Sequence, residues 1–452
     1  MLETLRTNHP LRRLMAAWLQ SCLGTGAGYV ALLLLTVRVR SLHSGWAVVA
    51  VLLADFLPAI AFGALFGMLA DRHPRRRLIV IANLLQAAAW LGLAFAHTAV
   101  PILALALLAG VGNALQRPPM RAALPVLAGE AKQSAAAWFD TCRWVGVTVG
   151  PVVAAALFAV SGTALPLALN GVSFALAAIA IATLSGIDAT PEGEDSDEHG
   201  EGLRAGLAVA FSAPAIASVI ICSAAAVISM GFLNVCEPLL ATHVLHGSGS
   251  DYALLVAAYG TGLVTGSVLV AHRGDVGPRV IVGRYLASLV LSGLGMAGSA
   301  IVGSVAPAAI SFAATGYANA LLVVSETQLI QLRVPNSVQG RLFGAKDTLE
   351  GAFFLIGLIG AGALVALVGV RVTLASGAGV YAVCSIAGLA TLGPLMRARM
   401  AGPTQRPEIA IAAAYGAIRR FDPAGAANGV ALPEPRTGLD TSRAEAEAGV
   451  TG

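Results

Sequence analysis

Residues 67–77 read Gly67-Met68-Leu69-Ala70-Asp71-Arg72-His73-Pro74-Arg75-Arg76-Arg77, and they separate two long apolar runs at about 46–70 and 78–96. Each run has roughly the ~20 residues that a helix needs to cross a bilayer. One carboxylate and four arginines cannot lie in hydrocarbon, so we predict that this stretch forms a tight loop at a membrane surface. Short loops rich in arginine stay on the cytoplasmic side, which predicts that this surface faces the cytoplasm.

The composition of the whole chain indicates a membrane protein. Of its 452 residues, 57% are hydrophobic and 12% are charged, whereas soluble domains are about 25% charged. A secretory signal would explain a single apolar segment but not a dozen. The cysteines lie inside apolar runs, and their spacing fits neither a disulfide framework nor a zinc site; they are Cys22, Cys142, Cys222, Cys236 and Cys384.

Twelve apolar runs predict twelve membrane spans. They lie at about 14–37, 46–70, 78–96, 101–116, 135–160, 164–187, 211–242, 251–271, 280–302, 305–331, 343–369 and 372–396. We predict an N-terminal six-span half at 1–187, an acidic linker at 188–206, a C-terminal six-span half at 207–396 and a tail at 397–452. The linker is expected to be a flexible cytoplasmic tether. The tail is rich in Ala, Pro, Gly and charge, and we expect it to be cytoplasmic and disordered.

Basic residues between the spans predict the orientation of the chain. With the N-terminus inside, the inward loops and flanks up to Arg399 hold nineteen arginines and lysines. The outward loops hold three, which are Arg38, Arg40 and Arg371. Positively charged short loops remain in the cytoplasm, so we predict a multi-pass protein with both termini cytoplasmic.

A weak internal repeat favours two related halves. The second run ends on Gly63-x-x-x-Gly67, and the eighth carries Gly262-x-x-x-Gly266, 199 residues later. Matching features at corresponding places are typical of transporters that are built from structural repeats.

The polar loop resembles the signature loop of the major facilitator superfamily, glycine-x-x-x-aspartate-arginine-x-glycine-arginine-arginine. The matching positions are Gly67, Asp71, Arg72, Arg75 and Arg76. Pro74 replaces the second glycine. The resemblance implies an all-α membrane protein of twelve transmembrane helices in two pseudo-symmetric six-helix bundles. It also implies a central cavity lined by the first, fourth, seventh and tenth spans, and a location in the cytoplasmic membrane of a bacterium.

The same resemblance assigns the loop to a cytoplasmic gate. It implies that Asp71 meets the start of the eleventh span, near Arg341 and Phe343. We expect the loop arginines to bond carboxylates or helix-end carbonyls across the same seam. Three further carboxylates near Arg333 and Arg341 are predicted to form interface salt bridges that hold the gate; they are Glu326, Asp347 and Glu350.

A second motif, Gly146-Val147-Thr148-Val149-Gly150-Pro151, lies in the fifth run. Small residues four apart let helix backbones approach closely, and the proline bends the helix. Gly146, Gly150 and Pro151 resemble the core of the superfamily's antiporter motif, although Ala154 and Ala155 replace its last two glycines. This resemblance favours export by exchange over uptake.

Two further segments, 116–125 and 334–341, are similar to the branch of enterobactin-exporter-like and macrolide-efflux-like permeases. Many drug/proton antiporters carry an arginine inside the fourth span. Here Arg117 lies at the predicted cytoplasmic end of that span, which does not favour proton coupling by that route.

Carboxylates inside the spans are the candidates for proton coupling. Asp55 lies beside Pro58 near the middle of the second span, and Glu237 lies beside Pro238 in the outer half of the seventh. A charge at that depth costs several kcal/mol unless it is paired or hydrated, so such residues mark ion pathways. The alternative for both is a structural residue that is hydrogen-bonded inside the bundle.

Four polar residues on the spans expected around the cavity are candidates for lining it: Tyr29, Asn113, Asn234 and Asn319. Helix–helix hydrogen bonding is the alternative role for each.

The prediction is therefore a secondary active exporter of small amphipathic molecules, such as drugs or secondary metabolites, which works by proton antiport and alternating access. The chain lacks a Gly-Lys dipeptide and hence a P-loop, and it lacks His-Glu-x-x-His and Gly-x-Ser-x-Gly. We expect no catalytic residues, no cofactor and no metal. The expected partners are a small-molecule substrate, protons and membrane lipid, with no nucleic acid, and the chain is expected to be a monomer.

Two alternatives remain at this point. A siderophore exporter or a small-molecule uptake permease would use the same fold. A membrane receptor or scaffold that transports nothing would come from another class. The loop and the glycine–proline span argue against a scaffold, because a scaffold needs no gate and no hinge.

Overall fold

The computed structural model describes residues 8–39, 45–129, 132–184, 187, 211, 214–272, 276–334 and 336–397. This part of the chain is helical throughout. Its N-terminal half contains α2 (His9–Arg38), α3 (Gly45–Arg72), α4 (Arg75–Leu93), α5 (Ala99–Ala128), α6 (Lys132–Ser161) and α7 (Ala164–Ala182). Its C-terminal half contains α9 (Pro214–Leu239), η3 (Leu240–Val244), α10 (Gly249–His272), α11 (Pro278–Ile301), α12 (Val305–Arg333) and α13 (Asn336–Arg397). The predicted linker and tail lie outside the described residues.

The predicted spans are confirmed, and the last two are joined in α13. Eleven helices in the described part are long and apolar enough to cross a membrane, and one of them covers Leu342–Gly393. Within that helix, Gly369 has φ 81° and ψ 172°, a backbone conformation that glycine adopts easily and other residues rarely do. Gly369 therefore divides α13 into two spans, which gives the twelve that the apolar runs predict.

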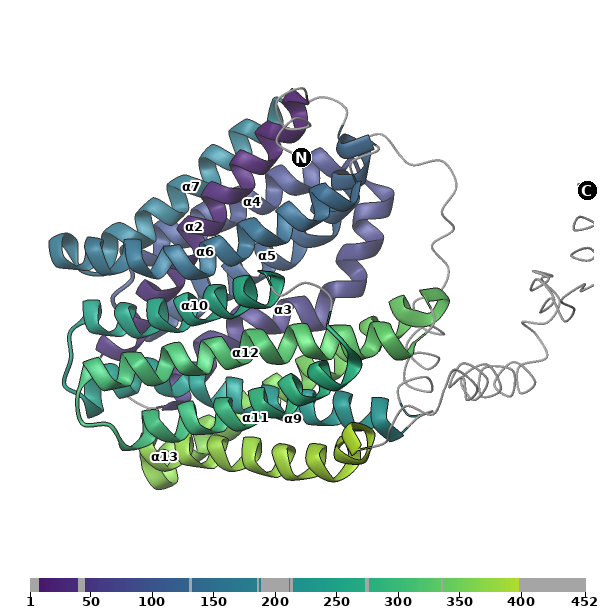
Figure 1. The fold of residues 1–452 in the computed structure, drawn as a ribbon. Helices are drawn as coiled ribbons and strands as arrows, with labels where there is room; N and C mark the ends of the chain where they lie inside the picture. The colour runs from purple at the N-terminus through teal and green to yellow at the C-terminus, as the bar shows by residue number, and fades with distance from the viewer. Residues whose placement is uncertain are drawn as a thin grey trace, which may run out of the picture.

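The helices form two bundles with the same internal packing (Figure 1). In the first bundle α2 packs on α6 and α7, α3 packs on α5, and α4 packs on α5 and α7. In the second bundle α9 packs on α13, α10 packs on α12, and α11 packs on α12 and α13. This is the predicted fold class, two pseudo-symmetric six-helix bundles.

The glycine pairs that suggested the repeat do not occupy equivalent surroundings. A Cβ on Gly262 or Gly266 would collide with α12, whereas one on Gly63 or Gly67 would meet no atom within 4 Å. The two halves therefore resemble each other in how their helices pack, and the two glycine pairs are not equivalent positions.

The fourth span is longer than predicted. Helix α5 continues to Ala128, although the apolar run ends near Gln116. The predicted span ended before the basic residues Arg117 and Arg121, but the helix continues through Pro118 and Pro119. Neighbouring helices in a membrane bundle can satisfy the carbonyls that a proline leaves free. The extra turns bury Met120 and Leu124 against the start of α2.

We call one end of the molecule the basic end, where α3 and α12 finish and α4 and α9 begin; it lies to the right in Figure 1. Arg72, Arg75 and Arg333 occupy those helix termini. Near the opposite end the two bundles are in contact. There a Cβ on Gly45 would lie 2.9 Å from Val365, and the rings of Phe56 and Phe354 meet edge to face at 5.2 Å.

Toward the basic end α3 and α13 pack less closely. Large apolar side chains on several sides of α3 are exposed there, including Ile60 at 55%, Phe62 at 49% and Met68 at 51%. A Cβ on Gly67 or on Gly351 of α13 would meet nothing within 4 Å. The described seam between α3 and α13 is therefore closely packed near one end and less closely packed toward the basic end.

Candidate functional site

Ionisable side chains of the two bundles lie near one another at the interface between the bundles. Tyr29 of α2 is within electrostatic reach of Asp55 on α3 and of Glu237 on α9. By helical rise, Asp55 is about 15 Å from the start of α3 and Glu237 about 10 Å from the end of η3, so both lie inside the membrane spans. The two candidate carboxylates, from opposite halves, thus share one neighbour in the middle of the molecule.

Two tyrosines of α10 complete this central cluster, which we define as Tyr29, Asp55, Glu237, Tyr252 and Tyr259. Tyr252, with none of its surface exposed, is within electrostatic reach of Glu237 and Tyr29, and Tyr259 is within reach of Glu237. The buried hydroxyls of Tyr29 and Tyr252 find no hydrogen-bond partner among the described residues. Buried hydroxyls are usually bonded, so these two are available to a bound molecule, a water or a protonated carboxyl group.

Asp55 sits where α3 crosses α5. A Cβ on Gly110 would lie 2.9 Å from the Cα of Asp55, so only glycine allows this approach. The side chain of Asp55 is half-buried, whereas Glu237 is 8% exposed. Arg117 is the cation within electrostatic reach of Asp55. The continuation of α5 therefore places Arg117 inside a membrane-spanning helix, and not at the end of one.

The predicted cavity-lining asparagines have different surroundings. Asn319 donates from Nδ2 to the hydroxyl of Tyr259 at 2.6 Å, which connects it to the central cluster. Asn234 donates to the carbonyl of Met230 in its own helix at 2.8 Å. Asn113 is half-buried and makes no hydrogen bond with another described residue.

The glycine–proline motif packs α6 against α2. A Cβ on Gly150 would lie 2.6 Å from the Cα of Gly26, and Gly146 faces the backbone of Cys22 at the same crossing. Pro151 is buried. The structure therefore agrees with the predicted close approach of backbones, and it shows that the approach lies within the first bundle.

The arginines of the polar loop bind carbonyls of their own bundle. Arg75 donates from Nη1 to the carbonyl of Ala122 at 3.1 Å, and Arg76 donates to that of Leu184 at 3.4 Å. We expected bonds across the seam, whereas these two bonds lie within the first bundle. Arg72 is exposed. The side chains of Asp71 and Arg341 lie outside the described residues.

Comparison with known proteins indicates which family the chain resembles. The family model described as Major Facilitator Superfamily matches residues 16–235, which hold both predicted motifs. Over these residues the chain resembles transporters of the major facilitator superfamily. It resembles the macrolide-efflux branch. Macrolide efflux protein A of Streptococcus pyogenes is 22% identical over 317 residues, covering 68% of this chain and 78% of that protein. Its namesake in Enterococcus faecalis is 22% identical over 316 residues, covering 68% and 97%.

Solved structures show the same fold. The nucleoside transporter NupG superposes with a TM-score of 0.65 at 14% identity, covering 85% of this chain and 99% of that one. A bacterial homologue of the iron transporter ferroportin, in an inward-facing state, gives a TM-score of 0.64 at 16% identity, covering 84% and 98%. At these identities the likeness concerns the fold alone.

The described salt bridges of the carboxylates predicted for the gate lie within one half of the molecule. Lys346 Nζ is 3.5 Å from Glu326 and 2.9 Å from Glu350, its neighbour one helical turn along α13. We expected arginine partners near the gate, but Lys346 lies on the same face of α13 as Glu350, and this face packs on α12. One pair joins α12 to α13 and the other lies within α13, so neither bridges the two bundles.

Sequence reasoning missed Tyr252, Tyr259 and the role of Arg117. The tyrosines stand in an apolar run without a motif around them, and only the helix register turns them toward Glu237. Arg117 had a usable signal, because the residues after its prolines, 120–128, are again mostly apolar.

Proposed function

We propose that the protein is a secondary active exporter of small amphipathic molecules, driven by proton antiport through rocking of the two bundles. The observation that carries the proposal is the central cluster. Asp55 and Glu237 come from opposite halves and lie around Tyr29, beyond the less closely packed part of the seam. A site built from both halves is exposed to each side in turn when the halves rock.

Protons suit this cluster as the coupling ion. Neither Asp55 nor Glu237 forms a salt bridge within 4.0 Å with a described residue, and carboxylates at membrane depth are costly when charged and unpaired. Each can become neutral by taking up a proton. A bound cationic substrate would stabilise the charged form, so substrate and proton would compete for the same carboxylates.

The basic end suits loading from the cytoplasm. The nineteen-to-three distribution of arginine and lysine supports a cytoplasmic position for the basic end. In that orientation the looser packing of α3 and α13 at the basic end suits an inward-open conformation. The resemblance to macrolide efflux proteins supports export, and the aromatic residues around two carboxylates favour substrates that are apolar and carry positive charge.

The proposal is tested by transport in proteoliposomes with an imposed pH gradient. We expect a cationic amphipathic dye or a basic macrolide to move against its gradient when protons move in the opposite direction. Substrate movement should stop when an ionophore collapses the pH gradient. Counterflow without any response to the pH gradient would rule out proton antiport, and the absence of counterflow for a broad substrate panel would favour a receptor or scaffold.

The proposed orientation predicts which positions are accessible from outside the cell. Leu42→Cys and His246→Cys should react with an impermeant thiol reagent in intact cells, and Asp195→Cys and Val338→Cys only after permeabilisation. The native cysteines are all buried, so the background should be low. Labelling of Asp195→Cys in intact cells would reverse the orientation.

A further inference from the structure

Two arginines of the first bundle lie inside its helices, far from the helix ends. By helical rise, Arg117 is about 16 Å from the end of α5, and Arg143 is about 16 Å from the start of α6. The two are within electrostatic reach of each other, and both side chains are exposed. Neither forms a hydrogen bond or a salt bridge with a residue that the structure describes. Because charge at membrane depth is costly unless it is paired or hydrated, these two neighbouring cations indicate a place for an anion.

The register of α5 turns Arg117 toward the central cluster. Gly110 packs on the backbone of Asp55, and Arg117 follows Gly110 by seven residues, which is two turns along the same face of the helix. The rise over these residues places Arg117 about 10 Å nearer the basic end than the crossing at Asp55. Asp55 and Arg117 are within electrostatic reach of each other. A molecule that lies along α5 would therefore meet carboxylates at one end and arginines at the other.

Arg143 is oriented by an aromatic ring. Its Cζ lies 4.9 Å from the centre of the Trp144 ring, within the ~6 Å of a cation–π contact. Asp140, one turn earlier on α6, forms no salt bridge with it. The ring fixes the guanidinium without neutralising its charge, so the N–H donors of Arg143 remain available to a ligand.

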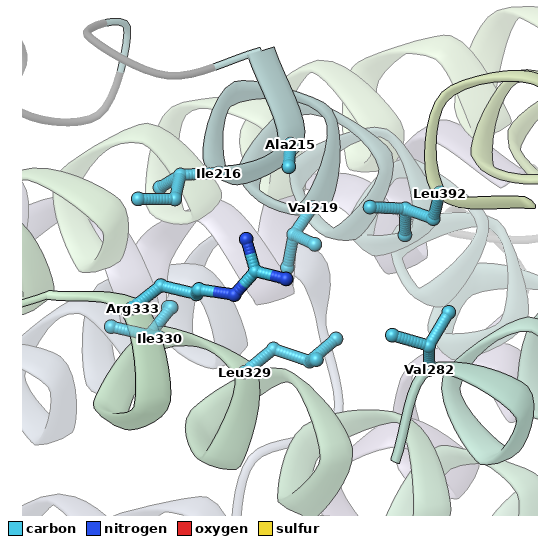
Figure 2. Close-up of a pocket in the computed structure, with 8 residues that line it drawn as sticks. All are labelled: Ala215, Ile216, Val219, Val282, Leu329, Ile330, Arg333 and Leu392. Carbon is cyan, nitrogen blue, oxygen red and sulfur yellow. The ribbon is translucent and has the colours of Figure 1, made fainter. Parts of the chain in front are cut away.

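The pocket between α9, α11, α12 and α13 is too small for such a ligand (Figure 2). Its lining is aliphatic apart from Arg333, and it has room for about one water molecule. A ligand with several charged groups is therefore expected beside the central cluster.

We propose that the exported molecule is an amphipathic zwitterion, whose amine meets the carboxylates of the central cluster and whose acidic group meets Arg117 and Arg143. This assignment rests on the proposed function and narrows its substrate class. Guanidinium groups bind carboxylates and phosphates through paired, charge-assisted hydrogen bonds. A substrate with positive charge alone would leave the two arginines without a counter-ion, and one with negative charge alone would do the same to Asp55 and Glu237.

The test is equilibrium binding of norfloxacin to the detergent-purified full chain near neutral pH, measured by fluorescence polarisation. Norfloxacin carries an amine and a carboxylate at opposite ends of a rigid aromatic frame. Its ethyl ester keeps only the amine charge, and N-acetylnorfloxacin keeps only the carboxylate. The wild type is expected to bind norfloxacin at least about tenfold more tightly than either analogue, because each analogue leaves one set of charged side chains unpaired.

Arg143→Gln is the decisive variant. It should reduce the preference for norfloxacin over the ester to about twofold or less, while affinity for the ester stays unchanged. Arg143→Lys should keep part of the preference, because lysine restores the charge but not the paired donors. Arg77→Gln is the matched control, since it removes an exposed arginine from the basic end of the same bundle and should leave the preference unchanged.

Equal affinity of the wild type for norfloxacin and its ester, or an unchanged preference in Arg143→Gln, would overturn the proposal. Absence of saturable norfloxacin binding would do the same. N-acetylnorfloxacin that binds as tightly as norfloxacin would assign the site to anions and overturn the zwitterion. Binding is measured without a proton gradient, so a failure of proton antiport would leave these results unchanged, and a missing preference would leave export of cationic molecules standing.

Discussion

Asp55→Asn is expected to lower proton-driven export at least about tenfold, because it removes a carboxylate at membrane depth that takes up and releases the coupling proton. Asparagine has nearly the shape of a protonated aspartic acid, so the crossing of α3 with Gly110 should be preserved. Substrate binding should stay within about threefold of wild type if Asp55 couples protons and does not hold the substrate. Export that remains should no longer respond to pH between about pH 6 and about pH 8.

The measurement is initial export rate in proteoliposomes at several pH values, normalised to the amount of reconstituted protein. Asp140→Asn is the matched control, since it makes the same substitution on an exposed carboxylate of the same half. Asp55→Glu should recover part of the pH response because it restores a titratable group. Wild-type rates and pH response in Asp55→Asn would make Asp55 structural, and Glu237 would then be the first candidate.

The two carboxylates need not contribute equally. Glu237 is more deeply buried, and three tyrosines of the central cluster are within its electrostatic reach. Asp55 has a cation within reach, Arg117, which favours its charged form until the substrate or a proton displaces that interaction. Comparing Glu237→Gln with Asp55→Asn separates these roles, because loss of substrate affinity identifies the binding carboxylate and loss of pH response identifies the coupling one.

The spans and the polar loop could be predicted from the sequence because hydrocarbon excludes charge. The order of apolar runs and basic loops leaves few alternatives, and the predicted twelve spans agree with the structure. The predicted end of the fourth span near Gln116 was too early, because the basic residues Arg117 and Arg121 that marked it lie within α5, which continues to Ala128. Local patterns therefore predict where a helix crosses the membrane better than where it stops.

The central cluster could be predicted only in part. The cost of a buried charge identified Asp55 and Glu237 one at a time, but these residues are 182 positions apart, and no local pattern brings them together. Their common neighbour Tyr29 was a candidate because of its span, whereas Tyr252 and Tyr259 depend on the rotation of α10 against α9. Which side chains of the two bundles become neighbours can be determined only from the packed structure.

The polar loop gives the second large expected effect. Arg75 and Arg76 donate to carbonyls of the first bundle, so these two contacts of the loop do not depend on the second bundle. Closure would then bring Asp71 to the start of α13, where helix N-termini offer unpaired backbone N–H groups. A carboxylate in that position contributes about 0.3–1 kcal/mol, and up to ~2 kcal/mol when partly buried.

Asp71→Asn should therefore favour the conformation that is open at the basic end. A loss of ~1.4 kcal/mol from the closed state changes the ratio of open to closed molecules about tenfold, because each state is weighted by its free energy. Spin labels on Met68→Cys of α3 and Thr348→Cys of α13, both exposed positions at this end, report the ratio as the relative weights of long and short distances. The substitution should increase the weight of long distances and slow transport, while Asp71→Glu should retain much of the short-distance population. Protein that reaches the membrane in normal amounts, shows an unchanged distance distribution and still fails to transport would mean that Asp71 acts elsewhere in the cycle, because a gate contact cannot be lost without a change in the populations that it sets.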